Sequence, residues 1–423
     1  MRIINVQDID SVIESVRPKT NNDVKEKVLS IISDVRRQKD KAIKEYEIKF
    51  SGVKIHSFKV TKKEIKSAYS MVGKDQIDGI KLAKLRLEKS ESAVLKKLEK
   101  ISITIDGILI KKSFLPIDTV GCYIPGGKAK YPSTIVMSVV PAKIAGVKKI
   151  IAVSPPNEKG EIDPLTLVAA DICGVDAFYK TGGAQAIAAL AYGTESIPRV
   201  DKIVGPGGVF VTLAKSLLSE VVSIDMIAGP TELAIIADAT ADAELVVLDM
   251  ISQAEHSSDT MCCLITNSLK LKNSVLKLLQ QKTKTIMRSS IVKESLRKNG
   301  FIAICSTEKQ MVNFANRLAP EHLEIITKKP RQLATKIKSA GLILIGRNTP
   351  SSAGDYLLGS NHILPTNGFG RTRGSLGVLD YMKLQTQIES SKSALDKILK
   401  YMKALTDSEG LPNHYEAVRG RLL

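Results

Sequence analysis

The sequence predicts an α/β fold with two doubly wound, Rossmann-like domains built on parallel sheets, an N-terminal helical segment and a C-terminal helical tail. From about residue 120, short β-branched runs alternate with alanine-rich helical stretches. IIAV precedes PLTLVAADICGV, and FYKTGG precedes AQAIAALAYGT. Such repeated βα units are typical of parallel sheets covered by helices on both faces. The expected strands outnumber those that a single sheet usually contains, so we expect two domains.

Residues 1–117 have a different pattern, which predicts a helical segment that also forms part of the first domain. Apolar residues from 23 to 50 recur at helical spacing and predict one amphipathic helix, and a second charged helical stretch follows from about 61 to 100. The segment ISITIDGILI then has two short apolar runs around Asp106-Gly107. Asp-Gly between such runs is typical of a hairpin turn.

The rest of the chain divides into three parts. Residues 118–232 carry glycine-rich turns after their strands, and residues 233–380 carry the strands expected in ELAIIAD, CCLIT, FIAIC, LEIIT and GLILIG. Residues 381–423 contain an amphipathic helix at 389–406 and the polar tail DSEGLPNHYEAVRGRLL. Disorder is the first expectation for such a tail unless it docks, for example on a neighbouring subunit.

The composition indicates where in the cell the protein is located and whether it forms disulfides. No uncharged apolar run reaches the ~18 residues that a membrane span needs, and the N-terminus lacks the apolar core of a signal peptide. We therefore expect a cytoplasmic protein with no membrane partner. The five cysteines are odd in number and show no CxxC spacing, which argues against a disulfide framework and against a cysteine-based zinc site.

The net charge of +18 raises the alternative of a nucleic-acid-binding protein. Much of the excess lies at 54–100 and 270–298, where lysine alternates with leucine and isoleucine, as on the solvated faces of amphipathic helices. The chain has no tryptophan and only 4% aromatic residues, so surfaces for base stacking are scarce. We expect no nucleic-acid partner.

Glycine pairs recur where a strand should pass into a helix: Gly126-Gly127, Gly182-Gly183 and the run Gly205-Pro206-Gly207-Gly208. Glycine lets the backbone approach a ligand closely, and the N-terminus of the following helix offers N–H groups to a phosphate. Each could also be only a tight turn. Three in one segment favour a nucleotide site, although the GxGxxG pattern of standard dinucleotide sites is absent.

Four of the five histidines follow a Glu or an Asn: His256, His322, His362 and His414. Imidazole is the side chain that most readily exchanges a proton near neutral pH, and it is the commonest metal ligand. Gln253 lies three residues before His256 at the end of an expected helix, so the two share a face. They could bind one cation, or they could form a hydrogen-bonded pair at the helix end.

Glu321 and His322 stand between an expected helix and an expected strand, where a carboxylate and an imidazole could act as a pair of general bases or simply face solvent. Asp355 and His362 follow the strand GLILIG, and loops beyond the carboxyl ends of parallel strands are where α/β proteins place their sites. Asp355 could ligate a metal or cap a turn, and His362 could bind an anion or a substrate carbonyl.

Taken together, the motifs closely resemble those of the histidinol dehydrogenase family. They occur in the order of the family and span residues 121–414. The matching blocks are GCYIPGG, TGGAQAIAALAYGT, KIVGPGG, DMIAGPTE, ISQAEH, APEHLEI, SAGDYLLGSNHILPT and EGLPNH.

The resemblance implies a zinc-dependent, NAD-linked enzyme that oxidises L-histidinol through L-histidinal to L-histidine, the last step of histidine biosynthesis. It also implies a homodimer with shared active sites, in which the C-terminal tail is swapped between subunits. One zinc ion per subunit would be held by Gln253, His256, Asp355 and His414, the last from the other subunit.

The resemblance also assigns roles to the remaining residues. His322 would take the alcohol proton, and Glu321 would activate water to attack the aldehyde. The expected substrate contacts are Thr231, Gln253, His256, His322, Asp355, His362, Glu409 and His414. The expected NAD contacts are Tyr123, Gln185 and Gly208.

Two positions depart from the family pattern. Gly208 stands where the family commonly has Asn, which removes one side-chain contact to the nucleotide. Thr231 stands where the family commonly has Ser, and its hydroxyl retains the expected substrate contact. Two rival hypotheses are a basic binding protein that has lost turnover and a zinc hydrolase. The intact Glu321 and His322 argue against the first, and the absence of an HExxH helix argues against the second.

Overall fold

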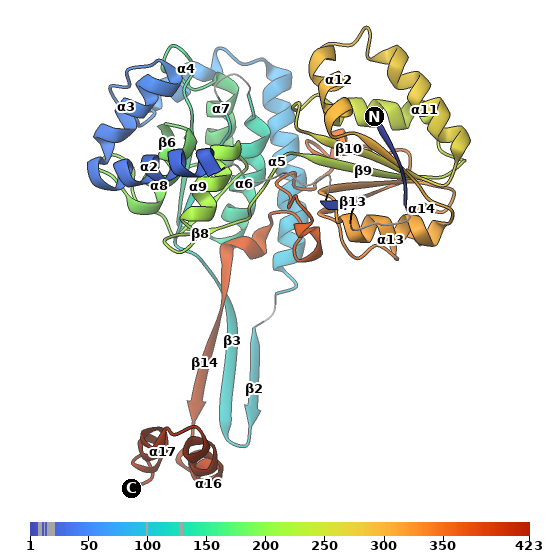
Figure 1. Cartoon of the computed structure of the whole chain (residues 1–423). Coiled ribbons are helices and arrows are strands. Elements are labelled where there is room, and N and C mark those ends of the chain that lie inside the picture. Colours follow the sequence, from blue (N-terminus) through green and yellow to red (C-terminus); the bar gives the residue numbers. More distant parts are fainter. Residues whose placement is uncertain (7–10, 12, 15–21, 99, 127–129) are drawn as a thin grey trace.

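The computed structural model describes residues 1–6, 11, 13–14, 22–98, 100–126 and 130–423. Within them the chain forms two α/β bodies that lie side by side and an arm that extends away from both (Figure 1). The prediction of an α/β fold with two parallel sheets is confirmed. No helix in the described residues is long and apolar enough to cross a membrane.

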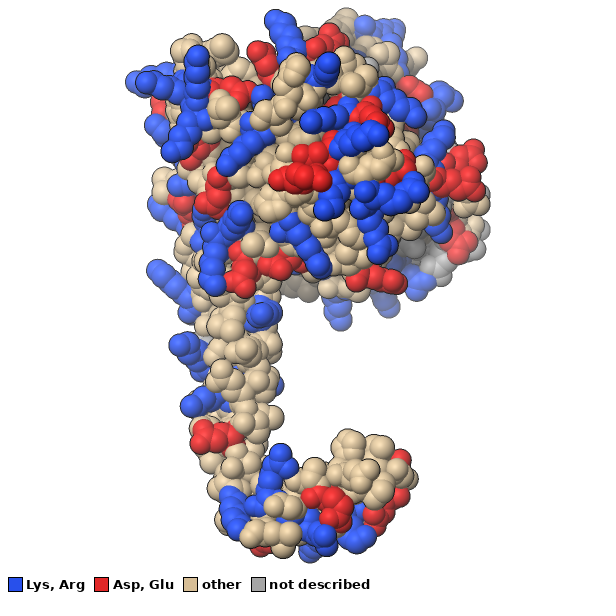
Figure 2. All heavy atoms as spheres, turned by 90° about the vertical axis from the view of Figure 1, so that its left-hand side faces the viewer, with Lys and Arg blue, Asp and Glu red and all other residues tan. Residues whose placement is uncertain are grey.

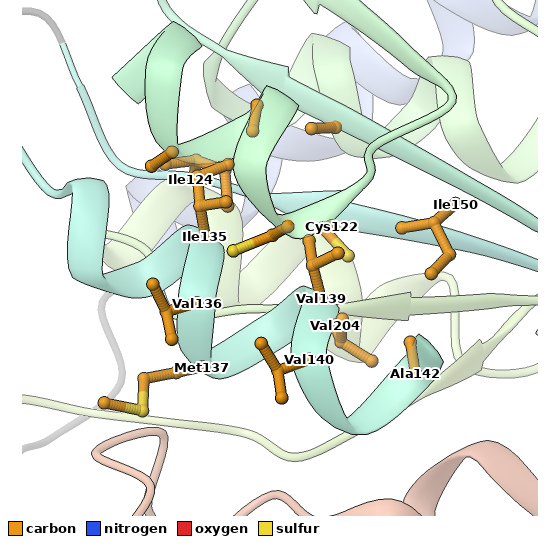
Figure 3. Close-up of a cluster of buried hydrophobic side chains, with 14 of the residues drawn as sticks. Cys122, Ile124, Ile135, Val136, Met137, Val139, Val140, Ala142, Ile150 and Val204 are labelled. Atoms are coloured by element: carbon orange, nitrogen blue, oxygen red, sulfur yellow. The ribbon is translucent and has the colours of Figure 1, made fainter. Parts of the chain in front are cut away.

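The first body is built on a parallel sheet with the strand order β6-β5-β4-β7-β8. Side chains alternate between its faces, so that Ile150 and Ala152 pack into one core and Ile151 and Val153 into the other. Figure 3 shows the first of these cores, in which α6 lies over the sheet. The strands are β4 (Thr119–Tyr123), β5 (Lys149–Ser154), β6 (Ala177–Lys180), β7 (Lys202–Val204) and β8 (Ser223–Ile224).

Helices from the N-terminal segment and from the βα units cover both faces of this sheet. The helices of the first face are α5 (Lys74–Leu95), α6 (Pro132–Ala145) and α7 (Pro164–Cys173). Those of the second face are α2 (Asn22–Gln38), α3 (Asp40–Ser51), α8 (Gly183–Tyr192) and α9 (Val209–Leu217). The N-terminal helices are therefore part of the first body.

The single helix expected at 23–50 is wrong, because the chain breaks it at Lys39. The backbone there has φ 50° and ψ −126°, which ends α2 and starts α3. The break lets both helices bury their apolar faces against the same core, with Val35 and Ile43 fully buried. The charged stretch after it is also two helices, α4 (Lys62–Tyr69), which begins with a capping box from Thr61, and α5.

The second body is built on a parallel sheet with the strand order β1-β11-β10-β9-β12-β13. All five strands expected in residues 233–380 are present, and the sequence did not predict β1, which joins the edge of the sheet from the other end of the chain. The strands are β1 (Arg2–Asn5), β9 (Glu232–Ala237), β10 (Met261–Thr266), β11 (Phe301–Ile304), β12 (His322–Ile326) and β13 (Leu342–Ile345).

The helices of the second body again lie on both faces of their sheet. One face packs against α10 (Ala243–Ala254), α11 (Leu269–Lys282) and α12 (Ser289–Lys298). The other packs against α13 (Glu308–Leu318) and α14 (Pro330–Ala334). All five cysteines of the chain are free and buried, and they belong to the apolar cores of the two bodies.

The arm consists of an antiparallel sheet with two helices at its tip (Figure 1). The predicted hairpin turn is confirmed, since Asp106 and Gly107 both have positive φ between β2 and β3. The tail is helical in its middle rather than irregular, because residues from Pro412 onward form α17. The elements of the arm are β2 (Ile101–Ile105), β3 (Ile108–Pro116), β14 (Met382–Ser390), α16 (Lys392–Ser408) and α17 (Pro412–Arg419).

Candidate active site

The two expected bases lie at the amino edge of the second sheet. His322 is the first residue of β12 and Glu321 precedes it, and both side chains are buried. The parallel neighbour β9 begins with Glu232, which is also buried. The site is therefore built where these parallel strands start, at the edge opposite to their carboxyl ends.

Backbone and carboxylate groups of β9 and β12 bind each other reciprocally. The N–H of Glu232 donates to Oε2 of Glu321 at 2.7 Å, and the N–H of Glu321 donates to Oε2 of Glu232 at 3.2 Å. Glu232 also accepts the N–H of Asn367 at 2.8 Å. The sequence motifs did not point to Glu232, although a carboxylate that opens the otherwise apolar strand ELAIIA was a signal for it.

His322 contacts acceptors through both of its ring nitrogens. Nδ1 lies 3.2 Å from the carbonyl oxygen of Glu232, and Nε2 lies 3.1 Å from Oδ1 of Asp355. Burial alone lowers the pKa of this imidazole, but Glu321 and Asp355 outweigh it and raise the pKa well above its usual value. In this arrangement His322 holds its proton toward Asp355.

The position of Asp355 corrects the expectation that it lies beyond the carboxyl end of β13. The chain leaves β13, forms α15 (Ser351–Gly354) and returns to the amino edge, where Asp355 meets the start of β12. The reason is a long-range contact: the N–H of Ser351 donates to Oε1 of Glu324 on β12 at 2.6 Å. Burial raises the pKa of Asp355, but His322, followed by His362 and His256, outweighs burial and lowers the pKa.

Gln253 and His256 come from the end of α10, as expected. Nδ1 of His256 lies 3.1 Å from the carbonyl oxygen of Gln253, which directs Nε2 of the ring outward as a possible ligand. Gln253 is 1% exposed, and the Nε2 end of its amide meets no hydrogen-bond partner among the described groups. A rotation of an amide group by 180° exchanges the positions of its oxygen and its nitrogen. In Gln253 this rotation would put the oxygen at the unpartnered position, where it can bind a cation.

The remaining expected ligand lies on the arm. His414 is an exposed residue of α17, and Glu409, also exposed, follows α16, so one chain does not bring them to the other site residues. In the described part of the chain, no three His, Cys, Asp or Glu side chains are placed to hold a metal ion. The expected ligand set includes only two such side chains from one subunit, His256 and Asp355, together with the amide of Gln253.

The other expected substrate contacts lie near the same edge. Nδ1 of His362 bonds the carbonyl of Asp355 at 2.7 Å, and its Nε2 lies 3.4 Å from the hydroxyl of Thr134 on α6 of the first body. Burial lowers the pKa of His362, although Asp355 opposes this. Thr231 is half-buried directly before β9. Thr134 was not predicted from the sequence, because its local pattern gives no signal.

A cavity of about 730 Å³ lies at the carboxyl edge of the first sheet, where nucleotides bind in doubly wound folds. Gly126, Gly182, Gly183 and Gln185 are among its lining residues. Tyr123, at the end of β4, accepts the N–H of Gly183 through its hydroxyl at 3.2 Å. Of the expected NAD residues, Gln185 lines this cavity, and Tyr123 is buried behind its wall, where it binds Gly183.

The third glycine turn, which contains Gly205 and Gly208, lies at the same sheet edge. Gly205 has φ 110°, and a Cβ there would lie 2.2 Å from the carbonyl oxygen of Tyr123, so only glycine fits. Gly208 is the exposed N-cap of α9. Gly127, the second residue of the predicted Gly126-Gly127 turn, lies outside the described residues.

Comparisons with known proteins place this arrangement in a family. The family model described as histidinol dehydrogenase matches residues 15–422. The chain is 43% identical to histidinol dehydrogenase of Methanocaldococcus jannaschii, over 93% of this chain and 92% of that protein. It is 44% identical to histidinol dehydrogenase of Oceanobacillus iheyensis, over 95% of this chain and 94% of that protein.

A solved structure extends the similarity to the whole fold. The crystal structure of histidinol dehydrogenase from Elizabethkingia anophelis matches with a TM-score of 0.94 at 34% sequence identity. The match covers 100% of this chain and 97% of that one. Both bodies and the arm are therefore shared with this protein.

Glu324, which anchors the loop of Asp355, should make stability depend on pH. Burial and the neighbouring carboxyl of Asp249 raise its pKa to about 8, from an ordinary 4.5. Since the folded protein then holds a proton that the unfolded chain has lost, this group makes the fold less stable as pH rises from about 5 to 8. Glu324→Gln keeps an acceptor for Ser351 but cannot ionise. As the pH rises from 5 to 9, we expect the unfolding free energy of this variant to increase relative to that of the natural chain by on the order of 2–4 kcal/mol.

Denaturant unfolding at pH 5, 7 and 9 measures this difference. Glu294→Gln, at an exposed carboxylate paired with Lys298, is the control and should show no comparable trend. A difference between Glu324→Gln and the natural chain that stays constant across this pH range would refute the assignment.

Proposed function

Because this chain belongs to the histidinol dehydrogenase family and is an oxidoreductase of histidine biosynthesis, we propose that it oxidises L-histidinol to L-histidine in two NAD-linked steps at a zinc site. The observation that carries the proposal is the meeting of Glu321, His322 and Asp355 at one sheet edge. An imidazole between two carboxylates is suited to moving protons. L-Histidinal is the proposed intermediate.

One zinc ion per subunit would be held by Gln253, His256, Asp355 and His414 of the partner subunit. Imidazole nitrogen and carboxylate oxygen are usual zinc ligands, and the outward Nε2 of His256 and the unpartnered amide end of Gln253 fit such a role. When bound, the ion would supply a positive charge that positions the substrate and polarises its alcohol oxygen.

In the first oxidation His322 accepts the alcohol proton at Nε2 while a hydride leaves the same carbon for NAD. Nε2 faces Asp355 in this structure and carries a proton toward it. His322 must therefore release this proton to solvent before the substrate hydroxyl replaces the carboxylate as the partner of Nε2. Nδ1 stays bonded to the carbonyl of Glu232, which fixes the ring. The aldehyde L-histidinal results.

In the second oxidation Glu321 removes a proton from water as it adds to the aldehyde. The aldehyde oxygen takes the proton that His322 gained in the first oxidation, which gives the hydrate and leaves Nε2 free again. The hydrate then loses a second hydride to NAD and a second proton to His322, which leaves the carboxylic acid. Oε2 of Glu321 is held by the N–H of Glu232, so its carboxylate is fixed beside His322, with Oε2 3.7 Å from Nδ1. Thr231, His362 and Glu409 would contact the substrate, Glu409 being on the arm.

We propose that the active protein is a homodimer in which each arm completes the site of the other subunit. The arm exposes a row of large apolar side chains, and Figure 2 shows a largely uncharged surface along its strands. A second copy would cover this surface and bring His414 and Glu409 to the site. The exposed apolar residues of the arm strands are Ile101, Ile103, Ile105, Leu384 and Ile388.

We further propose a cytoplasmic location, which the absence of any disulfide among the five described cysteines supports. On the face seen in Figure 2, lysines and arginines are interspersed with acidic side chains rather than gathered in one basic stripe. This distribution gives little support to a nucleic-acid partner. L-Histidinol remains the proposed small-molecule partner.

The main test is the stoichiometry of the reaction. Purified protein supplied with zinc, L-histidinol and NAD at alkaline pH should yield two NADH per histidinol, because each oxidation releases one hydride. Absorbance of NADH against consumed histidinol measures the ratio. His322→Ala is the control and should give no NADH above background. A natural protein that matches this control would refute the proposed function.

Subunit complementation tests the shared site. His322→Ala and His414→Ala should each be inactive alone, because one lacks the base and the other lacks the ligand that it gives to its partner. A mixed dimer has one site with both residues intact, so random exchange should restore up to about a quarter of the activity. No recovery after mass spectrometry has verified the mixed dimers would mean that the arm serves its own subunit.

Gly208 offers a test of the nucleotide turn. A Cβ at this position would meet nothing within 4 Å of the described atoms, and the extended backbone of an N-cap suits Asn. Gly208→Asn should lower the KM for NAD roughly three- to tenfold through one added hydrogen bond, with the KM for histidinol unchanged. Gly208→Ala, which adds only a methyl group, is the matched control. Equal KM values for the two variants would contradict a contact of this side chain with NAD.

A further inference from the structure

Glu47 is a fully buried carboxylate that binds the turn between β6 and α8. Its Oε1 accepts the hydroxyl of Thr181 at 2.7 Å, the N–H of Gly182 at 3.1 Å and Nε2 of Gln185 at 3.0 Å. Its Oε2 accepts the hydroxyl of Ser51 at 2.9 Å. The turn that it binds forms one wall of the 730 Å³ cavity of the first body.

These bonds decide which way the amide of Gln185 faces. A carboxylate only accepts hydrogen bonds, so the NH2 group of Gln185 must face Glu47 and its oxygen must face away. That oxygen is buried, and it has no hydrogen-bond partner in the part of the chain that the structure describes. Gln185 is 3% exposed and lines the cavity. A buried acceptor without a partner costs free energy unless a ligand supplies the donor.

The same bonds also occupy the N-terminus of α8. The N–H of Gly182 is bound by Glu47, and the N–H of Gly183 is bound by the hydroxyl of Tyr123. The first N–H groups of a helix, together with its dipole, are what usually attract a phosphate. Here the carboxylate of Glu47 accepts one of these N–H groups from behind the cavity wall, and its negative charge makes the turn less favourable to an anionic group.

We propose that Glu47 is a positioning residue that makes Gln185 an acceptor for an uncharged N–H or O–H donor of the bound dinucleotide and keeps its phosphates away from the N-terminus of α8. This inference rests on the proposed NAD-linked function. It assigns the end of the cavity at α8 to the base, the carboxamide or a ribose hydroxyl of the nucleotide. Glu47 itself does not line the cavity and acts through Gln185.

Removal of the carboxylate tests the positioning role. Glu47→Ala should raise the KM for NAD about tenfold, which corresponds to about 1.4 kcal/mol, with kcat and the KM for histidinol changed less than twofold. Glu47→Gln should restore the KM for NAD to within threefold of the natural value. Its amide oxygen can accept the three bonds of Oε1, and its NH2 can donate to Ser51. The dissociation constant of NADH, measured by fluorescence titration, should follow the same order without turnover.

Two comparisons separate this role from a purely structural one. In Gln185→Ala, the further change Glu47→Ala should leave the affinity for NADH within twofold, since Glu47 acts through the amide that is already lost. Glu91→Ala removes another buried carboxylate of the same body, which binds the N–H of Val378. It should lower the melting temperature without changing the KM for NAD.

The outcomes distinguish the inference from the proposed function. No NADH from the natural protein would refute the function itself. Normal turnover with an unchanged KM for NAD in Glu47→Ala, or fully additive effects of Glu47→Ala and Gln185→Ala, would overturn the role of Glu47 alone. Inorganic pyrophosphate gives a second readout, because it should compete with NADH more strongly in Glu47→Ala than in the natural protein.

Discussion

Buried carboxylates that accept backbone N–H groups hold the loops at both functional regions. Glu321 and Glu232 bind each other's N–H groups across β9 and β12, Glu324 binds the start of α15, and Glu47 binds the turn before α8. Each of these carboxyl oxygens satisfies a buried N–H group, and a buried N–H that loses its acceptor costs about 1–3 kcal/mol. Each carboxylate therefore fixes a loop that the apolar cores alone would leave free to move.

Local patterns predicted the fold well because each βα unit carries its own signal. A short β-branched run followed by an alanine-rich stretch is independent of distant contacts, so most strands of the two parallel sheets could be predicted from the sequence. The failures depend on tertiary contacts that local patterns do not contain. The pairing of β1 with β11 joins residues 2–5 to residues 301–304, and the break at Lys39 is stabilised by the packing of α2 and α3 on one core.

The candidate site shows the same division. Glu321 and His322 were recognisable because they are neighbours in sequence before an expected strand. The return of Asp355 to the amino edge was not, because it depends on the contact of Glu324 with Ser351. Glu232 could have been noticed as a charge that opens a buried strand. Glu47 could not, since a glutamate in the charged helix KEYEIKF cannot be told from its solvent-facing neighbours without the tertiary structure.

In a single chain, the arm leaves an apolar surface uncovered and the amino-edge site lacks a ligand. A second copy of the chain would supply both. The arm holds its apolar strands and both tip helices away from the bodies, which exposes Ile101, Ile103 and Ile388 to water. The site gathers His256 and Asp355 but lacks a third strong ligand from its own chain, as far as the described residues go. A monomer would carry both an aggregation-prone surface and an incomplete donor set. Exchange of arms would bury the first and complete the second in one step, so assembly and chemistry would depend on the same contact.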